Sequence, residues 1–270
     1  MSNYYFIVNA GDKIISSVSL SKFIPNIRGK SPKYIEFKVG VYTQTKTSTY
    51  WRKIDEVSFN ADNNIFIKSS NYNLEIGQIA VVIPCEVNFE LKEKLVALPE
   101  PISRKLDSSP VSERATISFE RGNAISSYQG DFPFNMSRIK GTFLAFDALS
   151  FNSQKGIKNK LIFINIFSQE LSEKKQFSLH VNNSITKEVI KKQPYFHNSA
   201  AIMDFDSDTD FPRIFYSKDT LGIPIFISYH NDLDSNLSLE HSHPPAEYFF
   251  GENKFLGQQQ LKTNWLSKLK

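Results

Sequence analysis

This sequence has little of what usually points to a specific class of protein. Its 270 residues include one cysteine, Cys85, so an intrachain disulfide is excluded. No apolar run approaches the ~20 residues that a membrane-spanning helix needs. The N-terminus lacks the basic region and the apolar stretch of a signal peptide. Together these features predict a cytoplasmic protein with no membrane partner.

Charge and catalytic motifs are equally sparse. The net charge is only +4, whereas a dedicated nucleic-acid-binding domain usually carries a pronounced basic stripe. The sequence has no Gly-rich phosphate loop, no G-x-G-x-x-G after a predicted strand and no nucleophile elbow. A Ser-His-Asp triad leaves no local signature, because its members need not be adjacent in sequence. The sequence thus favours a non-catalytic protein, with catalysis as an open alternative.

Aromatic residues, by contrast, are abundant. There are 23 Phe and 11 Tyr against 11 Gly, and aromatic side chains favour strands because they pack well on a pleated surface. In Lys33–Tyr42, Ile35, Phe37, Val39 and Val41 alternate with polar or aromatic residues, which is the period of a half-buried strand. The same reasoning predicts strands at Tyr4–Val8, Tyr50–Phe59, Ile65–Lys68, Gln78–Cys85, Ala115–Glu120, Gly141–Phe146, Leu161–Phe167, Phe177–Val181, Ala200–Phe205, Arg213–Tyr216 and Ile223–His230.

The predicted fold is mostly β, with two barrel- or sandwich-like units. Residues 99–111 are rich in Pro and Ser and have no hydrophobic period, which indicates a linker or crossover. It divides a small β barrel or sandwich at 1–98 from a larger β sandwich at 112–270. Two helices are predicted in the second unit. One spans residues 185–192, with Ser184 as its N-cap and Pro194 beyond its end.

The other predicted helix, Lys254–Leu269, is amphipathic. Its Leu261, Trp265 and Leu269 recur at every fourth residue and form one apolar stripe. Such a stripe usually packs on the protein's own core, and so we expect this helix to cover the second unit.

The densest group of candidate metal ligands lies in the run Glu240–Glu247. His241 and His243 share one face of a strand, Glu247 follows two prolines, and His230 lies upstream. The spacing His241-x-His243-x3-Glu247 resembles the first metal motif of the cupin family, which implies a divalent Zn, Mn or Fe ion inside a barrel. The sequence departs from that motif because Lys254 stands where its closing glycine is expected, and we assign no membership. The alternative is a proline-stiffened strand end.

Two further segments are candidates for recognition. Residues 126–136 are predicted to form a loop whose rings and small polar groups suit protein contacts, and the candidate residues there are Tyr128, Gln129, Asp131, Phe132 and Phe134. In the first unit, cations alternate with aromatic rings as in barrels that bind single-stranded nucleic acid, and the candidate residues are Tyr42, Lys46, Tyr50, Trp51, Arg52 and Lys53. An ordinary packed loop and a half-exposed strand are the respective alternatives.

From these observations we expect a non-catalytic cytoplasmic binding or assembly module. It would act through aromatic and polar loops, with protein partners, in a multi-protein or nucleoprotein assembly. A metal-binding enzyme or sensor built on His230, His241, His243 and Glu247 is the alternative. Single-stranded nucleic-acid binding by the N-terminal unit is a further one.

Overall fold

The computed structural model describes residues 2–24, 33–34, 36–103, 115–146, 156–205, 213–233, 236–241 and 254–269. The fold is mostly β, as predicted. It divides into two compact units. Unit 1 comprises Met1–Phe119, Ser127–Phe134 and Ser168–Glu173, and unit 2 comprises Glu120–Ser126, Asn135–Phe167 and Lys174–Lys270. Within the described residues, no helix is long and apolar enough to cross a bilayer.

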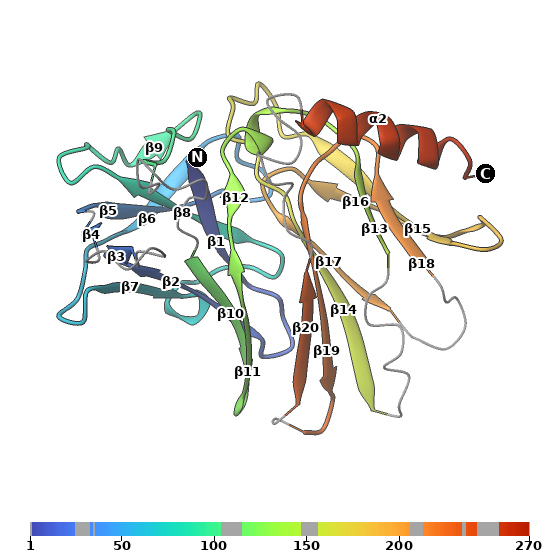
Figure 1. Ribbon diagram of the computed structural model, residues 1–270, viewed down its shortest axis with the longest axis horizontal. Helices are drawn as coiled ribbons and strands as arrows, with labels where there is room; N and C mark the ends of the chain where they lie inside the picture. Colours follow the sequence, from blue (N-terminus) through green and yellow to red (C-terminus); the bar gives the residue numbers. More distant parts are fainter. Residues whose placement is uncertain are drawn as a thin grey trace. The chain divides into compact units, whose positions relative to one another are not determined.

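The strands of unit 1 form a six-stranded sheet, β12-β1-β8-β5-β6-β9, and a four-stranded sheet, β11-β10-β2-β7, with β3 and β4 as a separate pair (Figure 1). The tip of the β10–β11 hairpin is grouped with unit 2. The bounds are β1 (Asn3–Val8), β2 (Ile15–Ser21), β3 (Phe23–Ile24), β4 (Lys33–Tyr34), β5 (Lys38–Thr43), β6 (Trp51–Val57), β7 (Asn64–Lys68), the 3-10 helix η1 (Ser69–Asn71), β8 (Ile79–Cys85), β9 (Lys94–Leu95), β10 (Ala115–Arg121), β11 (Ala124–Gly130) and β12 (Phe132–Pro133).

The centre of the six-stranded sheet is buried on both faces. Every residue of β8 is buried, in keeping with its apolar sequence, and β5 beside it is buried from Val39 to Thr43. Gly40 makes this packing possible, because a Cβ at this position would lie 2.7 Å from the Tyr42 ring. The Tyr42 hydroxyl donates a hydrogen bond to the Lys92 carbonyl at 2.9 Å. Strand β5 is therefore a central strand with two covered faces, whereas its sequence predicts one covered face.

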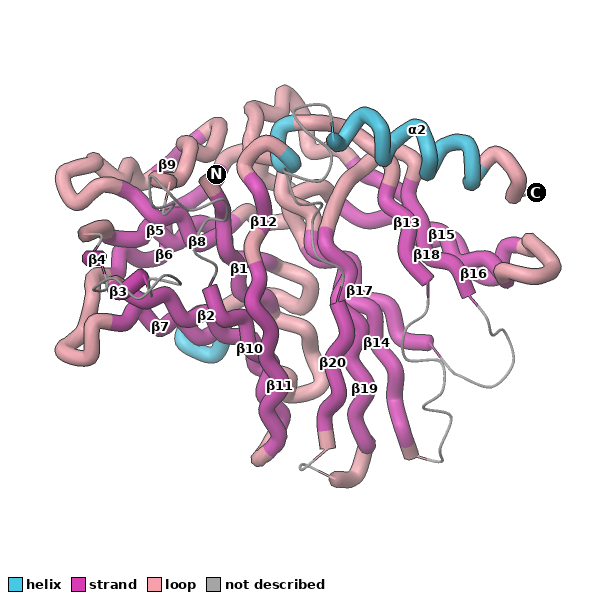
Figure 2. Tube along the Cα trace, in the orientation of Figure 1, coloured by secondary structure: helices cyan, strands magenta, loops and turns pink. Residues whose placement is uncertain are grey.

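Unit 2 contains two four-stranded antiparallel sheets, β13-β18-β15-β16 and β17-β14-β19-β20, and one α-helix (Figures 1 and 2). The bounds are the 3-10 helix η2 (Met136–Arg138), β13 (Phe143–Phe146), β14 (Ile157–Ile164), β15 (Gln176–Asn183), β16 (Val189–Phe196), β17 (Ala200–Phe205), β18 (Arg213–Ser217), β19 (Ile223–His230), β20 (Leu237–His241) and α2 (Lys254–Leu266).

The two sheets of unit 2 share one hydrophobic core. Phe143, Phe177 and Phe215 come from the first sheet, and Phe163 and Phe226 come from the second. The Phe143 and Phe163 rings lie 4.2 Å apart between centroids, and the Phe215 and Phe226 rings lie 5.4 Å apart. Because rings from both sheets meet in this core, the two sheets of unit 2 pack face to face.

Helix α2 lies along the outer face of the first sheet of unit 2, as the predicted C-terminal helix requires (Figure 1). Leu266 is buried against Ile214 and Tyr216 of β18, and Trp265 and Leu269 pack beside it. Leu261 belongs to the predicted stripe but is 70% exposed. The contact face is thus rotated away from Leu261 toward Leu266. Strand β18 is covered on both sides, since Phe215 faces the inner core and Ile214 and Tyr216 face α2.

The predicted helix at residues 185–192 is wrong. This segment is the turn of the β15–β16 hairpin followed by the first half of β16, which pairs with β15 through His180↔Lys192 and Val181↔Lys191. The pairing also gives Pro194 a different role, because it lies inside β16, and β16 is an edge strand of its sheet, where proline is tolerated. Tertiary strand pairing outweighs the local capping signal of Ser184.

The contact between α2 and β18 leads to a stability prediction. The substitution Leu266→Ala should lower the free energy of unfolding of unit 2 by about 2–4 kcal/mol, because it removes a buried side chain and leaves a cavity. Leu261→Ala, on the same helix, is the matched control and should change the free energy by less than about 0.5 kcal/mol. Urea denaturation of both variants measures the difference. Equal effects of the two substitutions would contradict the packing described here.

Candidate recognition surface

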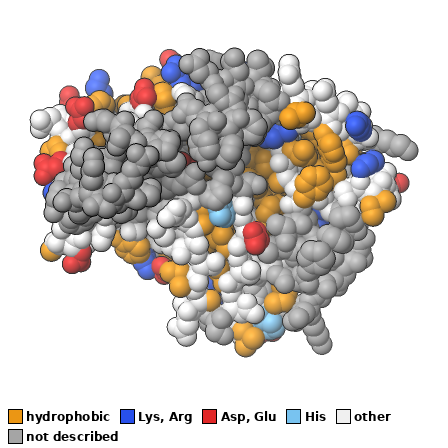
Figure 3. Space-filling view, viewed as in Figure 1, with side chains coloured by type: hydrophobic (Ala, Val, Ile, Leu, Met, Phe, Trp, Pro, Cys, Tyr) orange, Lys and Arg blue, Asp and Glu red, His pale blue; other side chains and the backbone are white. Residues whose placement is uncertain are grey.

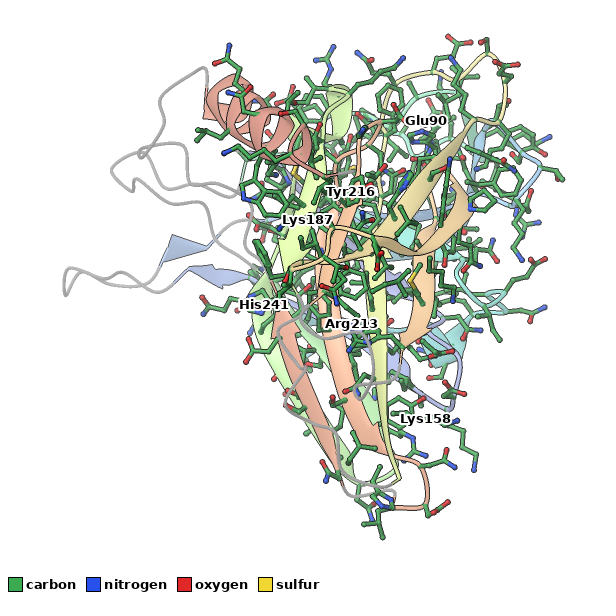
Figure 4. The ribbon with its side chains drawn as sticks, turned by 90° about the vertical axis from the view of Figure 1, so that its right-hand side faces the viewer. Glu90, Lys158, Lys187, Arg213, Tyr216 and His241 are labelled. Carbon is green, nitrogen blue, oxygen red and sulfur yellow. The ribbon has the colours of Figure 1, made fainter. Side chains whose placement is uncertain are left out.

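The structure separates His230 from His241, two of the three histidines of the predicted metal set. In the β19–β20 pair, His241 lies opposite Ile225, while His230 lies five residues further along β19, beyond the last pair of the ladder. At about 3.3 Å per residue, the two histidines are roughly 17 Å apart along the sheet. Lys158 pairs with Tyr229, the residue before His230. Figure 4 shows Lys158 far from His241, in agreement with this separation. His230 therefore cannot complete a metal site with His241.

The remaining two members of that set, His243 and Glu247, lie outside the described residues. The described ranges contain no group of three His, Cys, Asp or Glu side chains placed to hold a metal ion. The Nδ1 of His230 accepts a hydrogen bond from the Asp232 amide at 3.2 Å, which is an interaction within the β19–β20 connection. In the structure, His230 thus stabilises a turn.

The predicted recognition loop at 126–136 is largely packed inside the protein. Tyr128 is a buried residue of β11. The Phe132 side chain is fully buried in β12, which pairs with β1. Asp131 is also buried, while Gln129 is exposed and Phe134 is partly buried. Burial, followed by the nearby Asp131 charge, raises the pKa of Tyr128 far above its usual range. These residues form strands and core contacts, because the rings that suit recognition also suit strand packing.

Two aromatic rings of the predicted nucleic-acid-binding set, Trp51 and Tyr42, are buried in the core. Trp51 and Tyr42 have no exposed surface, and so neither ring can stack on a base in this conformation. Burial, with smaller contributions from the charges of Cys85, Glu93 and Glu56, raises the pKa of Tyr42 to about 12. Strand β9 pairs with β6 through Trp51↔Leu95, and the Lys92 carbonyl binds the Tyr42 hydroxyl. The segment around β9 therefore lies beside both rings.

Most cations of this set have partners within the protein. The Lys53 ammonium lies 2.9 Å from Glu93 and 3.7 Å from Glu56, and it donates to the Leu91 carbonyl at 2.8 Å. Hydrogen bonding to Glu93 is the main cause that raises the pKa of Lys53. Lys46 lies 3.4 Å from Glu75. Arg52 is exposed, and the partly exposed Tyr50 ring lies under the Lys94 ammonium at 5.1 Å.

A rigid turn joins β15 to β16 in unit 2. The Asn183 side-chain oxygen accepts hydrogen bonds from the backbone amides of Ile185 at 2.8 Å and Thr186 at 3.0 Å. The Asn182 amide donates to the Lys187 carbonyl at 2.9 Å, and Lys187 adopts a left-handed backbone with φ of 69°. A backbone hydrogen bond closes the turn, because the Asn183 amide donates to the Glu188 carbonyl at 3.0 Å. The turn therefore has a fixed conformation supported by its own hydrogen bonds.

This turn exposes apolar side chains next to α2. Ile185 is 73% exposed, Val189 is 54% exposed, and Phe146 at the end of β13 is 54% exposed. We call Phe146, Ile185, Lys187, Val189 and Trp265 the hairpin–helix surface. Figure 3 shows hydrophobic side chains gathered over the part of unit 2 where α2, β13 and β18 lie, with Lys and Arg side chains nearby.

Trp265 connects the hairpin to the helix. The Phe146 and Trp265 rings form a T-shaped contact with their centroids 5.6 Å apart. The Lys187 ammonium lies 5.3 Å from the Trp265 ring centroid. Lys187 also donates a hydrogen bond to the Ser184 carbonyl. Figure 4 shows Lys187 and Tyr216 on the side of unit 2 where α2 lies. These contacts hold three parts of the chain together at one surface.

The charges around this surface are mainly positive. Lys192 of β16 is exposed on this face of the sheet, Lys187 adds a second cation, and Glu188 is the acid in the turn. His180 lies across from Lys192 and stacks on Tyr216 with ring centroids 4.8 Å apart. Burial, and next the charges of Lys192 and Lys218, keep the pKa of His180 below its usual range, while Asp219 opposes them. The histidine is therefore neutral at pH 7, and the lysines supply the charge.

The sequence contained one signal for this surface, which the helix prediction concealed. In Asn182–Glu188, two asparagines and a serine separate two runs that alternate in polarity, which is typical of a hairpin turn. The exposure of Ile185 and Val189 and the proximity of Trp265 follow from tertiary packing and have no local signature.

The turn geometry predicts local protection of its amides. Asn183→Ala removes the acceptor of two backbone amides, and so hydrogen exchange at Ile185 and Thr186 should accelerate several-fold, at a cost of about 1 kcal/mol in stability. The control is Asn60→Ala, because Asn60 accepts from the amides of Asp62 and Asn64 in a similar turn of unit 1. Exchange at residues 185 and 186 should be unaffected there. Unchanged exchange in Asn183→Ala would show that the turn does not depend on this side chain.

No protein-family model matches this chain, and no curated protein matches its sequence. A proposed role for the molecule must therefore come from the surfaces that its own residues form. Among the described residues, the hairpin–helix surface has the clearest combination of exposure, rigidity and aromatic support.

Proposed function

We propose that this chain is a non-catalytic binding or assembly module that contacts a protein partner through the hairpin–helix surface of unit 2. The observation that carries the proposal is the 73% exposure of Ile185 on a hydrogen-bonded turn beside Trp265. An isolated exposed apolar side chain needs no explanation, but several that lie together often mark an interaction site.

Rigidity supports this proposal. A flexible loop loses conformational entropy when it binds, whereas a turn that is already ordered loses little. The Asn183 and Asn182 hydrogen bonds order the turn before any partner arrives. Aromatic residues such as Trp265 and Phe146 are also enriched at the centres of interfaces, because they contribute large areas with few rotatable bonds.

The charges indicate the chemistry of the partner. Lys187 and Lys192 lie on or beside the apolar side chains. A complementary surface would have an apolar depression for Ile185 and Val189 and acidic residues at its rim. Rim charges of this kind mainly increase the association rate, and so we expect binding that weakens moderately with salt.

Site-specific photo-crosslinking tests the proposal. A photoreactive amino acid replacing Ile185 or Val189, in the cells that produce this chain, should give a discrete protein adduct. The matched control is the same replacement at Val96, which is 59% exposed in unit 1 and should give no adduct of that size. Mass spectrometry identifies the partner, whose contact surface we expect to be acidic at its rim.

Charge insertion provides the second arm of this experiment. Val189→Asp, combined with the photoreactive residue at position 185, should reduce the adduct yield at least fivefold, because a carboxylate cannot be buried in an apolar contact without a large desolvation cost. Val96→Asp should leave the yield unchanged. Crosslinking only to nucleic acid, or equal adducts from positions 185 and 96, would contradict the proposal.

A further inference from the structure

Tyr50 and Arg52 of the predicted nucleic-acid-binding set are exposed on unit 1, beside the edge strand β9 of the six-stranded sheet (Figure 1). Trp51 of β6 pairs with Leu95 of β9, and Trp51 is fully buried. Because successive side chains of a strand point to opposite faces, the next pair, Arg52 and Lys94, points away from the core. Both of these side chains are exposed. The pairing therefore places two cations on one solvent-facing side of β6 and β9.

The two cations lie directly opposite each other. Residues opposed in an antiparallel pair have Cβ atoms about 4.5–5.5 Å apart, and like charges in such a pair destabilise it. Within the ranges that the structure describes, neither Arg52 nor Lys94 has a carboxylate partner, and the neighbouring Glu93 lies 2.9 Å from the Lys53 ammonium instead. An anion bound across Arg52 and Lys94 would relieve their repulsion.

Tyr50 adds an aromatic ring to the same face. The Lys94 ammonium lies 5.1 Å from the centre of the Tyr50 ring, and Tyr50 is 39% exposed with the lysine in this position. The Ser48 hydroxyl donates a hydrogen bond to the Tyr50 carbonyl at 2.7 Å, and the Tyr50 amide donates to the Ser48 oxygen at 3.1 Å. These two bonds fix the backbone that carries the ring. The ring is therefore held beside the cations before any ligand binds.

We propose that Tyr50, Arg52 and Lys94 bind a single-stranded nucleic acid, with the two cations on neighbouring phosphates and the Tyr50 ring stacked on a base. Cations that follow the backbone and rings that stack on bases are the two components of single-strand binding without sequence preference. A single strand suits this surface because its bases are unpaired and can stack on a side chain. The surface is separate from the hairpin–helix surface, whose residues all belong to unit 2.

The sequence pointed to only two of these three residues. Lys94 is absent from the predicted set, because only the pairing of β9 with β6 places it opposite Arg52.

Fluorescence anisotropy with a labelled oligouridylate tests the proposal. Binding should be saturable at low salt. Each neutralised phosphate of a single strand contributes about 0.7 to the slope of log affinity against log salt, and so two phosphate contacts give a slope of about 1.4. The affinity should therefore fall about sevenfold between about 50 and about 200 mM sodium chloride. An inorganic polyphosphate of the same charge offers no bases and should bind about tenfold more weakly.

Three variants separate the charges from the ring. Arg52→Ala and Lys94→Ala should each lower the salt slope by about 0.7, because each removes one phosphate contact. Tyr50→Ala should weaken binding about tenfold without changing the slope, because it removes the stacking ring and no charge. Tyr50→Phe keeps the ring and should bind like the unmodified chain.

Lys158→Ala is the matched control, because Lys158 is an exposed strand lysine of unit 2. It should leave the affinity and the salt slope unchanged, and thermal unfolding checks that every variant is folded. Three outcomes would overturn the proposal. They are the absence of saturable binding at low salt, binding of a duplex or of polyphosphate as tight as that of the single strand, and equal effects of Lys94→Ala and Lys158→Ala.

Discussion

The aromatic core of unit 2 is the constraint on which the other features of that unit depend. Phe143, Phe177 and Phe215 interdigitate with Phe163 and Phe226 from the opposite sheet, and this packing sets the distance and register of the two sheets. Once the strands are aligned by that core, every connection must lie at one of the two ends of the sandwich. The β15–β16 turn lies at one of these ends, and its side chains are placed by strand register.

Strand β18 links that core to the hairpin–helix surface. Phe215 points into the core, while Ile214 and Tyr216 point outward, where water would otherwise contact them. Helix α2 covers them with Leu266 and Trp265. Because the covering helix also brings Trp265 to Phe146 and Lys187, the same packing that completes the fold creates an aromatic surface beside the exposed turn. The Asn183 side chain accepts a hydrogen bond from the Ile185 amide, and the Ile185 side chain is exposed.

The two ends of the sandwich differ in chemistry for a physical reason. At the hairpin end, the turn satisfies its own polar groups, and apolar side chains remain outside. At the opposite end, Asn165 and Asn198 are buried, and their side chains form hydrogen bonds with the connections there. The hairpin end therefore leaves apolar side chains exposed, whereas the opposite end is held by buried hydrogen bonds.

Part of this molecule is determined by its sequence alone. The β class, the strands from Tyr4 to Val8 and from Ile223 to His230, and the C-terminal helix follow from hydrophobic period and side-chain type, because these act over a few residues. Tertiary structure decided the rest. Pairing with β15 made a strand of residues 189–196 despite a helix cap signal, covering segments buried Trp51 and Tyr42, and strand register separated His230 from His241. Burial and register depend on contacts between residues far apart in the chain, and a local pattern carries no information about them.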